Sequence, residues 1–257
     1  MVTEILLLVA GFVGGVLNSL AGGGSFVVFP ALLAAGVPPV LANASNTYAA
    51  LPGYISGAAG FWSDILKHRD RLLVYSIIAL IFGWLGAEIL LLVSNETFAL
   101  AVPWLMLFAV ALFAFGNRIN RFVQSRAGGG SRMQAAGAGL LLLLLALTCV
   151  YGGFFNAGLG ILLLAFLALA GLTDIHAMNG LKLWISTLVA LVAVVRFTLS
   201  GSIDWYHGSI ALVGVTIGGY VAARLAHRVP TPLLRALVIV YGVGITGYFF
   251  WSTYAAG

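Results

Sequence analysis

The stretch Gly14–Ser25 reads GGVLNSLAGGGS and interrupts an otherwise apolar run from Ile5 to Val37. Its glycines, serines and asparagine break what would otherwise be a membrane-spanning helix. Unpaired backbone N–H and C=O groups are costly in lipid, so non-helical chain at membrane depth must be buried in protein or line a water-filled cavity. This stretch is therefore the first candidate for a binding site.

A second break of the same kind spans Gly152–Gly160, which reads GGFFNAGLG. Two glycines and an asparagine of the first break, Gly14, Gly15 and Asn18, recur in the second at one constant offset. We interpret the two breaks as the same feature used twice.

Composition places the chain among polytopic helical membrane proteins. Of its 257 residues, 62% are hydrophobic and only 7% are charged, and no soluble domain of this size could keep so apolar a surface in water. The apolar runs are long and continuous rather than alternating, which favours an all-α fold over a transmembrane barrel. The net charge of +5 comes from a few loops, so it indicates membrane orientation and not nucleic-acid binding.

The chain divides into two similar halves of four hydrophobic segments each. We predict a first transmembrane repeat at 1–116, a basic, glycine-rich cytoplasmic linker at 117–132, and a second repeat at 133–257. Each half opens with a broken segment, continues with a polar helix and ends with two further helices. In the polar helices, Asn43 and Asn46 align with Asn179 and Lys182. Internal repeats of this kind build many transporters, which bind substrate at the repeat interface.

The charge pattern predicts that both broken segments re-enter. Basic connections face the cytoplasm, and here they are 64–71, 117–132 and 224–231. Eight plain crossings would put the last of these outside. If both broken segments dip in and return, all three connections are cytoplasmic, both chain ends are outside, and the halves are related by inverted topology. Eight crossings with a weakly obeyed charge rule are the alternative.

The breaks carry the chemistry of an anion site. A new short helix is predicted to start at about Ser25 and at about Gly160, and a helix N-terminus offers free N–H groups and about half a positive charge. Two such termini, brought together from opposite faces, would bind an anion near mid-membrane. The candidate substrate-binding residues are Asn18, Ser19, Gly22, Gly23, Gly24 and Ser25 in the first break, Asn156, Gly158 and Gly160 in the second, and Asn46, Thr47, Asn179 and Lys182 in the polar helices.

Each of these signals also has a plainer explanation. Lys182, about two turns into its helix, would supply a full charge to the site, but it could instead snorkel or pair with Asp174 or Glu88. Arg196 and Glu88 are expected to be interfacial snorkellers. The glycines could serve only close helix packing, and the asparagines of the breaks could cap helix C-termini.

No catalytic constellation, cofactor motif or metal-ligand cluster is visible. The single Cys149 allows neither an intrachain disulfide nor a cysteine-based metal site, and no G-x-x-x-x-G-K-[S/T] motif points to ATP. We therefore predict a protein that is not an enzyme and has no cofactor. A proton is the candidate coupling ion, although no acidic residue stands out as a carrier at mid-membrane.

The motifs resemble those of a known family. The segment GGVLNSLAGGGSFVVFPALL, the ANASNT of the polar helix, and their recurrence as GGFFNAGLG and MNGLK are similar to the TauE/SafE family of sulfite and organosulfonate transporters, also called the toluene-sulfonate uptake permease family. The resemblance spans nearly the whole chain and implies a plasma-membrane permease for sulfur-containing anions. One departure lies at the start of the polar helix, where many members carry a Thr-Ser pair and this chain has Asn43, Ser45, Asn46 and Thr47.

The sequence thus predicts a multi-pass transporter of the cell membrane whose partners are the lipid bilayer and a small anion such as sulfite, thiosulfate or an organosulfonate. Asn46, Thr47 and Asn179 are expected to line the path, with Lys182 as its charge. A passive anion channel with the same site and a non-transporting membrane scaffold or assembly factor are the alternatives.

Overall fold

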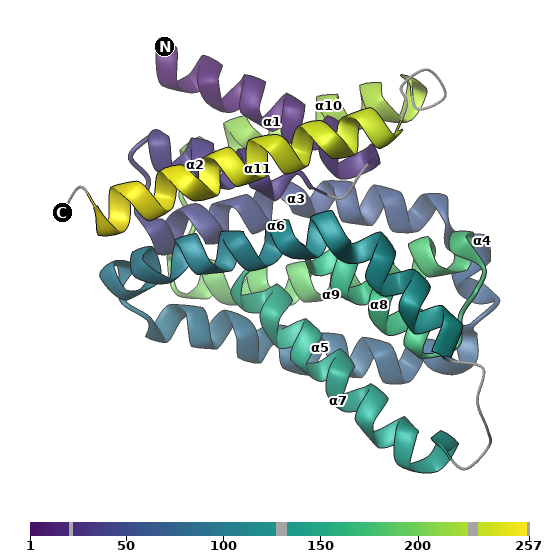
Figure 1. Ribbon diagram of the computed structural model, residues 1–257. Coiled ribbons are helices and arrows are strands. Elements are labelled where there is room, and N and C mark those ends of the chain that lie inside the picture. Colours follow the sequence, from purple (N-terminus) through teal and green to yellow (C-terminus); the bar gives the residue numbers. More distant parts are fainter. Residues whose placement is uncertain (21–22, 127–132, 226–230, 256–257) are drawn as a thin grey trace.

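The computed structural model describes residues 1–20, 23–126, 133–225 and 231–255, and within these ranges its regular structure is entirely helical (Figure 1). The helices are α1 Val2–Leu20, α2 Ser25–Ala34, α3 Pro39–Gly60, α4 Trp62–Leu66, α5 Arg69–Leu92, α6 Asn95–Arg126, α7 Met133–Phe154, α8 Leu159–Leu169, α9 Ile175–Leu199, α10 Trp205–Leu225 and α11 Thr231–Tyr254.

Four helices among the described residues are long and apolar enough to cross a membrane, namely α1, α5, α6 and α9. The outer surface of the helical body carries large apolar side chains, such as Leu73 on α5 and Leu199 on α9, which are more than two-thirds exposed. Such a surface suits contact with lipid rather than with water. The prediction of a multi-pass helical membrane protein is confirmed.

The breaks fall where glycine and asparagine predict them. The first separates α1 from α2, and the second separates α7 from α8. The short helices begin at Ser25, as predicted, and at Leu159, one residue before the predicted start. Helix α6 continues to Arg126, past the predicted end of the first repeat at residue 116, so helix extends into the predicted linker 117–132. Residues 127–132 of that linker lie outside the described residues.

Each broken segment is a hairpin rather than an interrupted straight helix. A Cβ atom built on Gly14 of α1 would lie 3.1 Å from the carbonyl oxygen of Gly24 and would press on Val28 of α2. Likewise, a Cβ atom on Gly152 of α7 would lie 2.7 Å from a methyl group of Leu159. The short helices therefore double back beside the long helices that precede them.

Side-chain contacts define the two ends of the helical body. At one end, Arg71 donates to the carbonyl oxygen of Ala170 at 3.0 Å, and the rings of Phe61 and His176 lie 6.3 Å apart. We call this end, where α3 finishes and α9 begins, the basic end. The ends of α6 and α10 lie on the same side of Figure 1, and both chain termini lie on the other.

The opposite end is where α3, α6 and α10 begin. There the backbone N–H of Val40 donates to Asn95 at 3.0 Å, and Tyr206 donates to Glu4 at 3.1 Å. The segment α1–α2 therefore starts and finishes at the opposite end, and α7–α8 starts and finishes at the basic end. A re-entrant segment must start and finish at the same end of the molecule, as these two segments do. Their re-entry into a bilayer stays a prediction.

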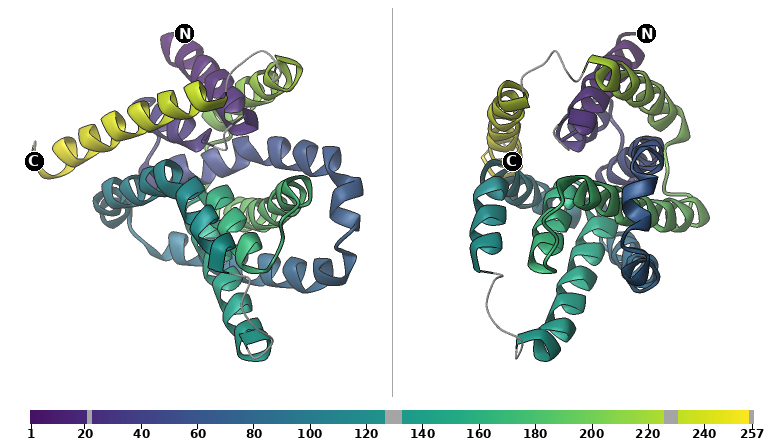
Figure 2. Two further views of the ribbon diagram at one scale, coloured as in Figure 1. Left: turned by 45° about the vertical axis from the view of Figure 1, so that its right-hand side comes forward. Right: turned by 90° about the vertical axis from the view of Figure 1, so that its right-hand side faces the viewer.

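The first helix of each half packs against a helix of the other half. Helix α1 packs chiefly on α10, and α7 packs chiefly on α5, which is the matching pair with the halves interchanged. Both views of Figure 2 place α10 beside α1. A Cβ atom on Gly15 would lie 2.8 Å from the backbone nitrogen of Gly219, and one on Gly153 would lie 3.1 Å from that of Ala87. At these glycines, close packing of helices explains the missing side chain.

Candidate functional site

A cavity of about 790 Å³ lies between α1, α3, α9 and α10. It reaches the molecular surface near the basic end, because Phe61 just after α3 and the exposed Tyr220 near the end of α10 line it. Its polar lining comes from four helices: Asn18, Ser19, Ser56, Asn179, Lys182, Thr216 and Tyr220. Four of the predicted site residues, Asn18, Ser19, Asn179 and Lys182, are thus brought together from both repeats.

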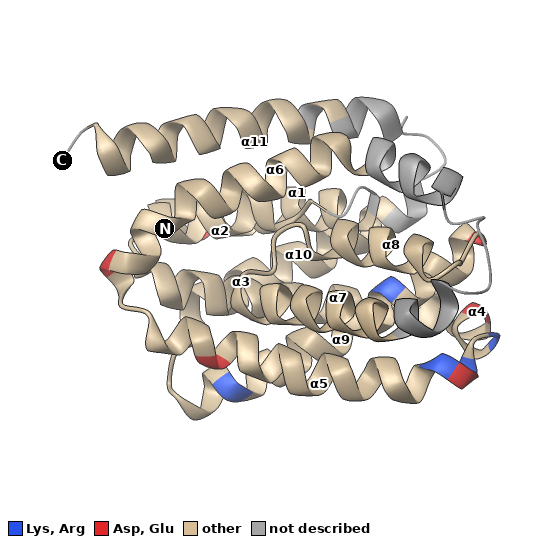
Figure 3. Cartoon of the chain, turned by 60° about the horizontal axis from the view of Figure 1, so that its bottom comes forward, with Lys and Arg blue, Asp and Glu red and all other residues tan. Residues whose placement is uncertain are grey.

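Lys182 places a positive charge in this cavity. It lies about two turns inside α9, and its Nζ donates to the side-chain oxygen of Asn179 at 3.1 Å. No ion pair to Lys182 is present among the described residues. Figure 3 shows most of the described charged positions near the two ends of the helical body.

The two acidic partners considered for Lys182 are engaged elsewhere. Asp174 caps the start of α9 by accepting from the backbone N–H of His176 at 2.9 Å, and this hydrogen bond lowers the pKa of Asp174 below its usual value. Glu88 of α5 forms an ion pair with Arg196 of α9. The alternative in which Lys182 pairs with either carboxylate is therefore wrong for this structure.

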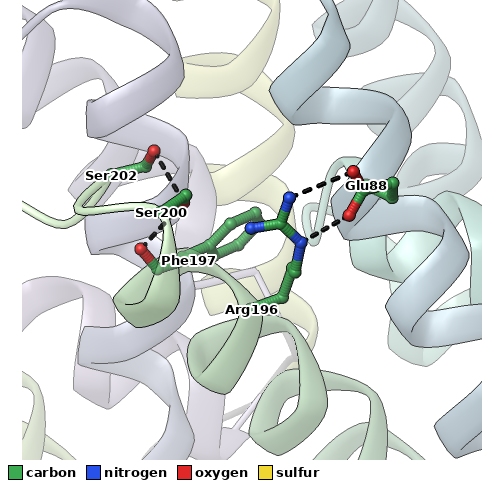
Figure 4. A network of polar contacts seen from close by, with 5 residues as sticks. All are labelled: Glu88, Arg196, Phe197, Ser200 and Ser202. Carbon is green, nitrogen blue, oxygen red and sulfur yellow. Dashed lines mark hydrogen bonds and ion pairs between the residues drawn. The ribbon is translucent and has the colours of Figure 1, made fainter.

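The pair Glu88–Arg196 corrects a second expectation, since the two side chains do not snorkel separately. In Figure 4 the guanidinium group of Arg196 faces both carboxylate oxygens of Glu88, and its Nη2 lies 3.0 Å from Oε1. The pair bridges α5 and α9 at the opposite end of the molecule from the cavity mouth.

Each polar helix meets the start of the short helix in its own repeat. Asn46 of α3 donates to the hydroxyl of Ser25, the first residue of α2, at 3.1 Å. In the second repeat the equivalent contact is hydrophobic, since a Cβ atom on Gly160 would lie 3.4 Å from the side-chain carbon Cδ of Lys182. Asn46 and Lys182, which align between the halves, thus each lie beside the first turn of the short helix in their own half.

The first break forms a small void beside the cavity. The void has a volume of about 10 Å³ and is lined by Gly14, Asn18, Gly24, Ser25 and Asn46, among others. Asn18 and Val215 line both spaces. Gly24, Ser25 and Asn46 thus line the void next to the cavity rather than the cavity itself.

Two predicted residues of the first repeat point elsewhere. Thr47 is buried, and its hydroxyl donates to the carbonyl oxygen of Asn43, so it does not line the cavity. Gly23 packs towards Phe26 and Val238. Gly22 lies outside the described residues.

The second break is closed. Asn156 is buried, and its side-chain oxygen accepts from the hydroxyl of Tyr54 at 3.2 Å. Gly158 adopts a left-handed conformation with φ of 83° at the start of α8, which explains a glycine at this position. A Cβ atom there would lie 3.4 Å from that of Ala109. Asn18 therefore faces the cavity, whereas its counterpart Asn156 does not.

The sequence prediction missed the wall that α10 contributes. Val215, Thr216, Gly219 and Tyr220 line the cavity, as do Pro52, Gly53 and Gly57 of α3. Small residues at helical spacing and a proline inside a polar helix were the available signals. They show that close or irregular packing is possible there but do not say which helix supplies the partner.

Comparison with known proteins agrees with this architecture. The family model described as "Sulfite exporter TauE/SafE" matches residues 7–249. A probable membrane transporter protein of Haemophilus influenzae is 29% identical over 94% of this chain and 92% of its own length. The probable membrane transporter protein YfcA of Escherichia coli K12 is 27% identical over 99% of this chain and 93% of its own. No solved structure matches the chain.

The family match covers nearly the whole chain, and both relatives are named as probable membrane transporter proteins. The chain therefore belongs to the TauE/SafE family and is a membrane transporter.

Proposed function

We propose that the chain is a secondary transporter of a small sulfur-containing anion such as sulfite or an organosulfonate. The observation that carries this proposal is Lys182, a cation that lines a cavity between membrane helices and has no carboxylate partner among the described residues. Lys182 is half-buried, and a charge inside a membrane-spanning helix is costly without a partner, so it is expected where an anionic ligand completes the pair.

The groups around Lys182 suit an oxyanion. Asn18 and Ser19 can donate neutral hydrogen bonds from α1, and Asn179 holds the Lys182 ammonium group by accepting from it. The first turn of α8 passes beside the Lys182 side chain, so its positive dipole adds to the same field. The opposed half-helix termini of the sequence prediction remain part of this proposal.

The cavity has the size of a site for a small organic anion. Its volume of about 790 Å³ falls within the ~300–1,000 Å³ that is usual for small-molecule sites. An organosulfonate fits such a space without displacing side chains, and a bare oxyanion would bind there with water. The printed description of the matching family, a sulfite exporter, supports a sulfur oxyanion as substrate.

The test is anion flux into proteoliposomes for Lys182→Gln, Lys182→Arg and a matched control, Lys67→Gln. Lys67 is exposed and pairs with Asp64 outside the cavity. We expect Lys182→Gln to lower sulfite uptake by roughly tenfold to a hundredfold, as for removal of one charge from a buried pair. Lys182→Arg should retain part of the flux, and Lys67→Gln should behave as wild type. Full flux in Lys182→Gln would contradict the proposal.

The same vesicles separate the transporter from its alternatives. A proton-coupled transporter accumulates sulfite when a pH gradient is imposed, whereas a passive channel follows only the electrochemical gradient of the anion. A scaffold or assembly factor shows neither flux nor a saturable thermal shift with sulfite, thiosulfate, sulfate, sulfoacetate or taurine.

A further inference from the structure

We propose that the molecule has a second access path at the end opposite the cavity mouth, closed in this structure by the ion pair Glu88–Arg196, with Asn43 and Asn156 behind it. This inference builds on the proposed transport function, because a transporter must reach its ligand from both sides of the membrane. It is argued from the comparison of equivalent surfaces in the two repeats.

The cavity wall on α3 has a counterpart on α9. The offset that relates Asn43 and Asn46 to Asn179 and Lys182 also relates cavity-lining residues of α3 to residues nearer the end of α9. Gly53, Gly57 and Phe61 correspond in this way to Val189, Ala193 and Phe197.

This counterpart surface is tightly packed. Val189, Ala193 and Phe197 are at most 1% exposed. Helix α5 covers them in the position that α10 takes in the other half, and a Cβ atom on Gly83 would lie 3.1 Å from the Cα atom of Val189. The same architectural surface is therefore open at one end of the molecule and shut at the other.

The ion pair holds the closed end together. Arg196, in the last turn of α9, donates hydrogen bonds from two nitrogens to the carboxylate of Glu88 on α5 (Figure 4). Its guanidinium carbon also lies 5.9 Å from the ring centroid of Trp84. The counterpart of Arg196 at the open end is Gly60, which has no side chain and cannot form such a bridge. The position equivalent to Arg196 therefore carries no charged contact at the open end.

Two buried polar atoms behind the pair lack hydrogen-bond partners among the described residues. They are Oδ1 of Asn43 and Nδ2 of Asn156, and both residues are at most 3% exposed. Their counterparts Asn179 and Asn18 line the open cavity. A buried polar atom without a hydrogen-bond partner needs an explanation. Here the explanation is that water or ligand reaches Asn43 and Asn156 when this end of the molecule opens.

The closed path connects the pair with these asparagines. Asn43 donates to the carbonyl oxygen of Phe154 at 2.8 Å. A Cβ atom on Gly86, two residues before Glu88, would lie 2.9 Å from the backbone nitrogen of Phe154. Movement of α5 away from α9 and α7 would therefore uncover the end of α7, where Asn43 of α3 donates to Phe154 and the second break with Asn156 follows.

The test measures which end is accessible to an impermeant methanethiosulfonate reagent. Ala193→Cys reports the closed end and Ser56→Cys the open end, both in a Cys149→Ala background reconstituted in vesicles. We expect Ala193→Cys to react slowly from the opposite end in the presence of the ion pair. Arg196→Gln should speed this reaction by roughly tenfold or more, since removal of the ion pair shifts a two-state equilibrium. Ser56→Cys should then react more slowly from the basic end.

The charge-reversed double variant Glu88→Arg/Arg196→Glu should restore slow labelling of Ala193→Cys, which a general loss of packing would not do. An unchanged Ala193→Cys rate in Arg196→Gln overturns the proposal, and so does an increase at both reporters together. Because labelling needs no transported anion, this result is independent of whether Lys182→Gln abolishes sulfite flux.

Discussion

At the scale of single residues, asymmetry between the repeats matters more than the repeat itself. Position 46 is asparagine and its counterpart 182 is lysine, so a fixed charge stands in only one half of the site. Asn18 lines the cavity, whereas Asn156 is held by Tyr54. A two-fold architecture with unequal side chains can bind one anion in a defined orientation.

The hydrogen bond from Tyr54 to Asn156 yields the first prediction at this scale. Tyr54→Phe leaves the side-chain oxygen of Asn156 buried without a donor, in a residue whose side-chain nitrogen already has no acceptor among the described residues. We expect a stability loss of about 1–3 kcal/mol, measured as a lower midpoint of thermal unfolding in detergent. Tyr48→Phe is the matched control, because the 3.4 Å contact of Tyr48 with Ser209 is long and only partly buried. Equal shifts in both variants would argue against the assigned role.

At the scale of elements, glycine decides which helices can touch. The pairs α1–α10 and α7–α5 approach so closely that backbone atoms of one helix occupy the place where a glycine of the other has no side chain. Without a hydrophobic drive between helices in lipid, such close contact supplies packing energy that larger residues would prevent.

Two alanine substitutions should therefore change the stability of the protein in opposite directions. A methyl group at Gly15 would collide with the carbonyl oxygen of Val215, while one at Gly247 of α11 meets nothing within 4 Å. Glycine is about 1 kcal/mol worse than alanine inside a helix. We expect Gly247→Ala to raise the thermal midpoint and Gly15→Ala to lower it. The assay is thermal unfolding of purified protein, and a neutral Gly15→Ala would mean that α1 and α10 are less close than described.

At the scale of the whole molecule, charge and topology point the same way. The connections that carry most of the arginine and lysine leave helices that end at the basic end, whereas the chain termini lie at the other. Under the positive-inside rule the basic end faces the cytoplasm. The same rule predicts that the cavity mouth faces the cytoplasm.

Reporter fusions test this arrangement. With both broken segments re-entrant, the C-terminus and the connection at residues 200–204 lie outside, and eight plain crossings would put both inside. We expect alkaline phosphatase fused at either point to be active in a bacterial host, with a fusion in the connection at residues 67–68 as the inactive control. Active phosphatase at residues 67–68 would reverse the orientation.

Much of the fold follows from local sequence. Long apolar runs predict the helices, and clusters of glycine and asparagine predict the breaks to within a residue or two, because helix formation and its interruption depend on neighbours along the chain. The recurrence of the same pattern gives the two halves and singles out Asn18, Asn179 and Lys182, which do line one cavity.

The sequence by itself therefore determined a helical membrane protein with two glycine-broken segments, and it predicted a cationic site between them. Only the tertiary structure decided that Arg196 forms an ion pair with Glu88, 108 positions away. Glu88 is therefore not the partner of Lys182, which donates to Asn179 instead. The tertiary structure also decided that α10 lines the cavity, and that Asn18 of the first break lines it while Asn156 of the second break is buried. Apolar helices can pack against one another in many ways, so partner choice between distant segments depends on the assembled shape of both repeats.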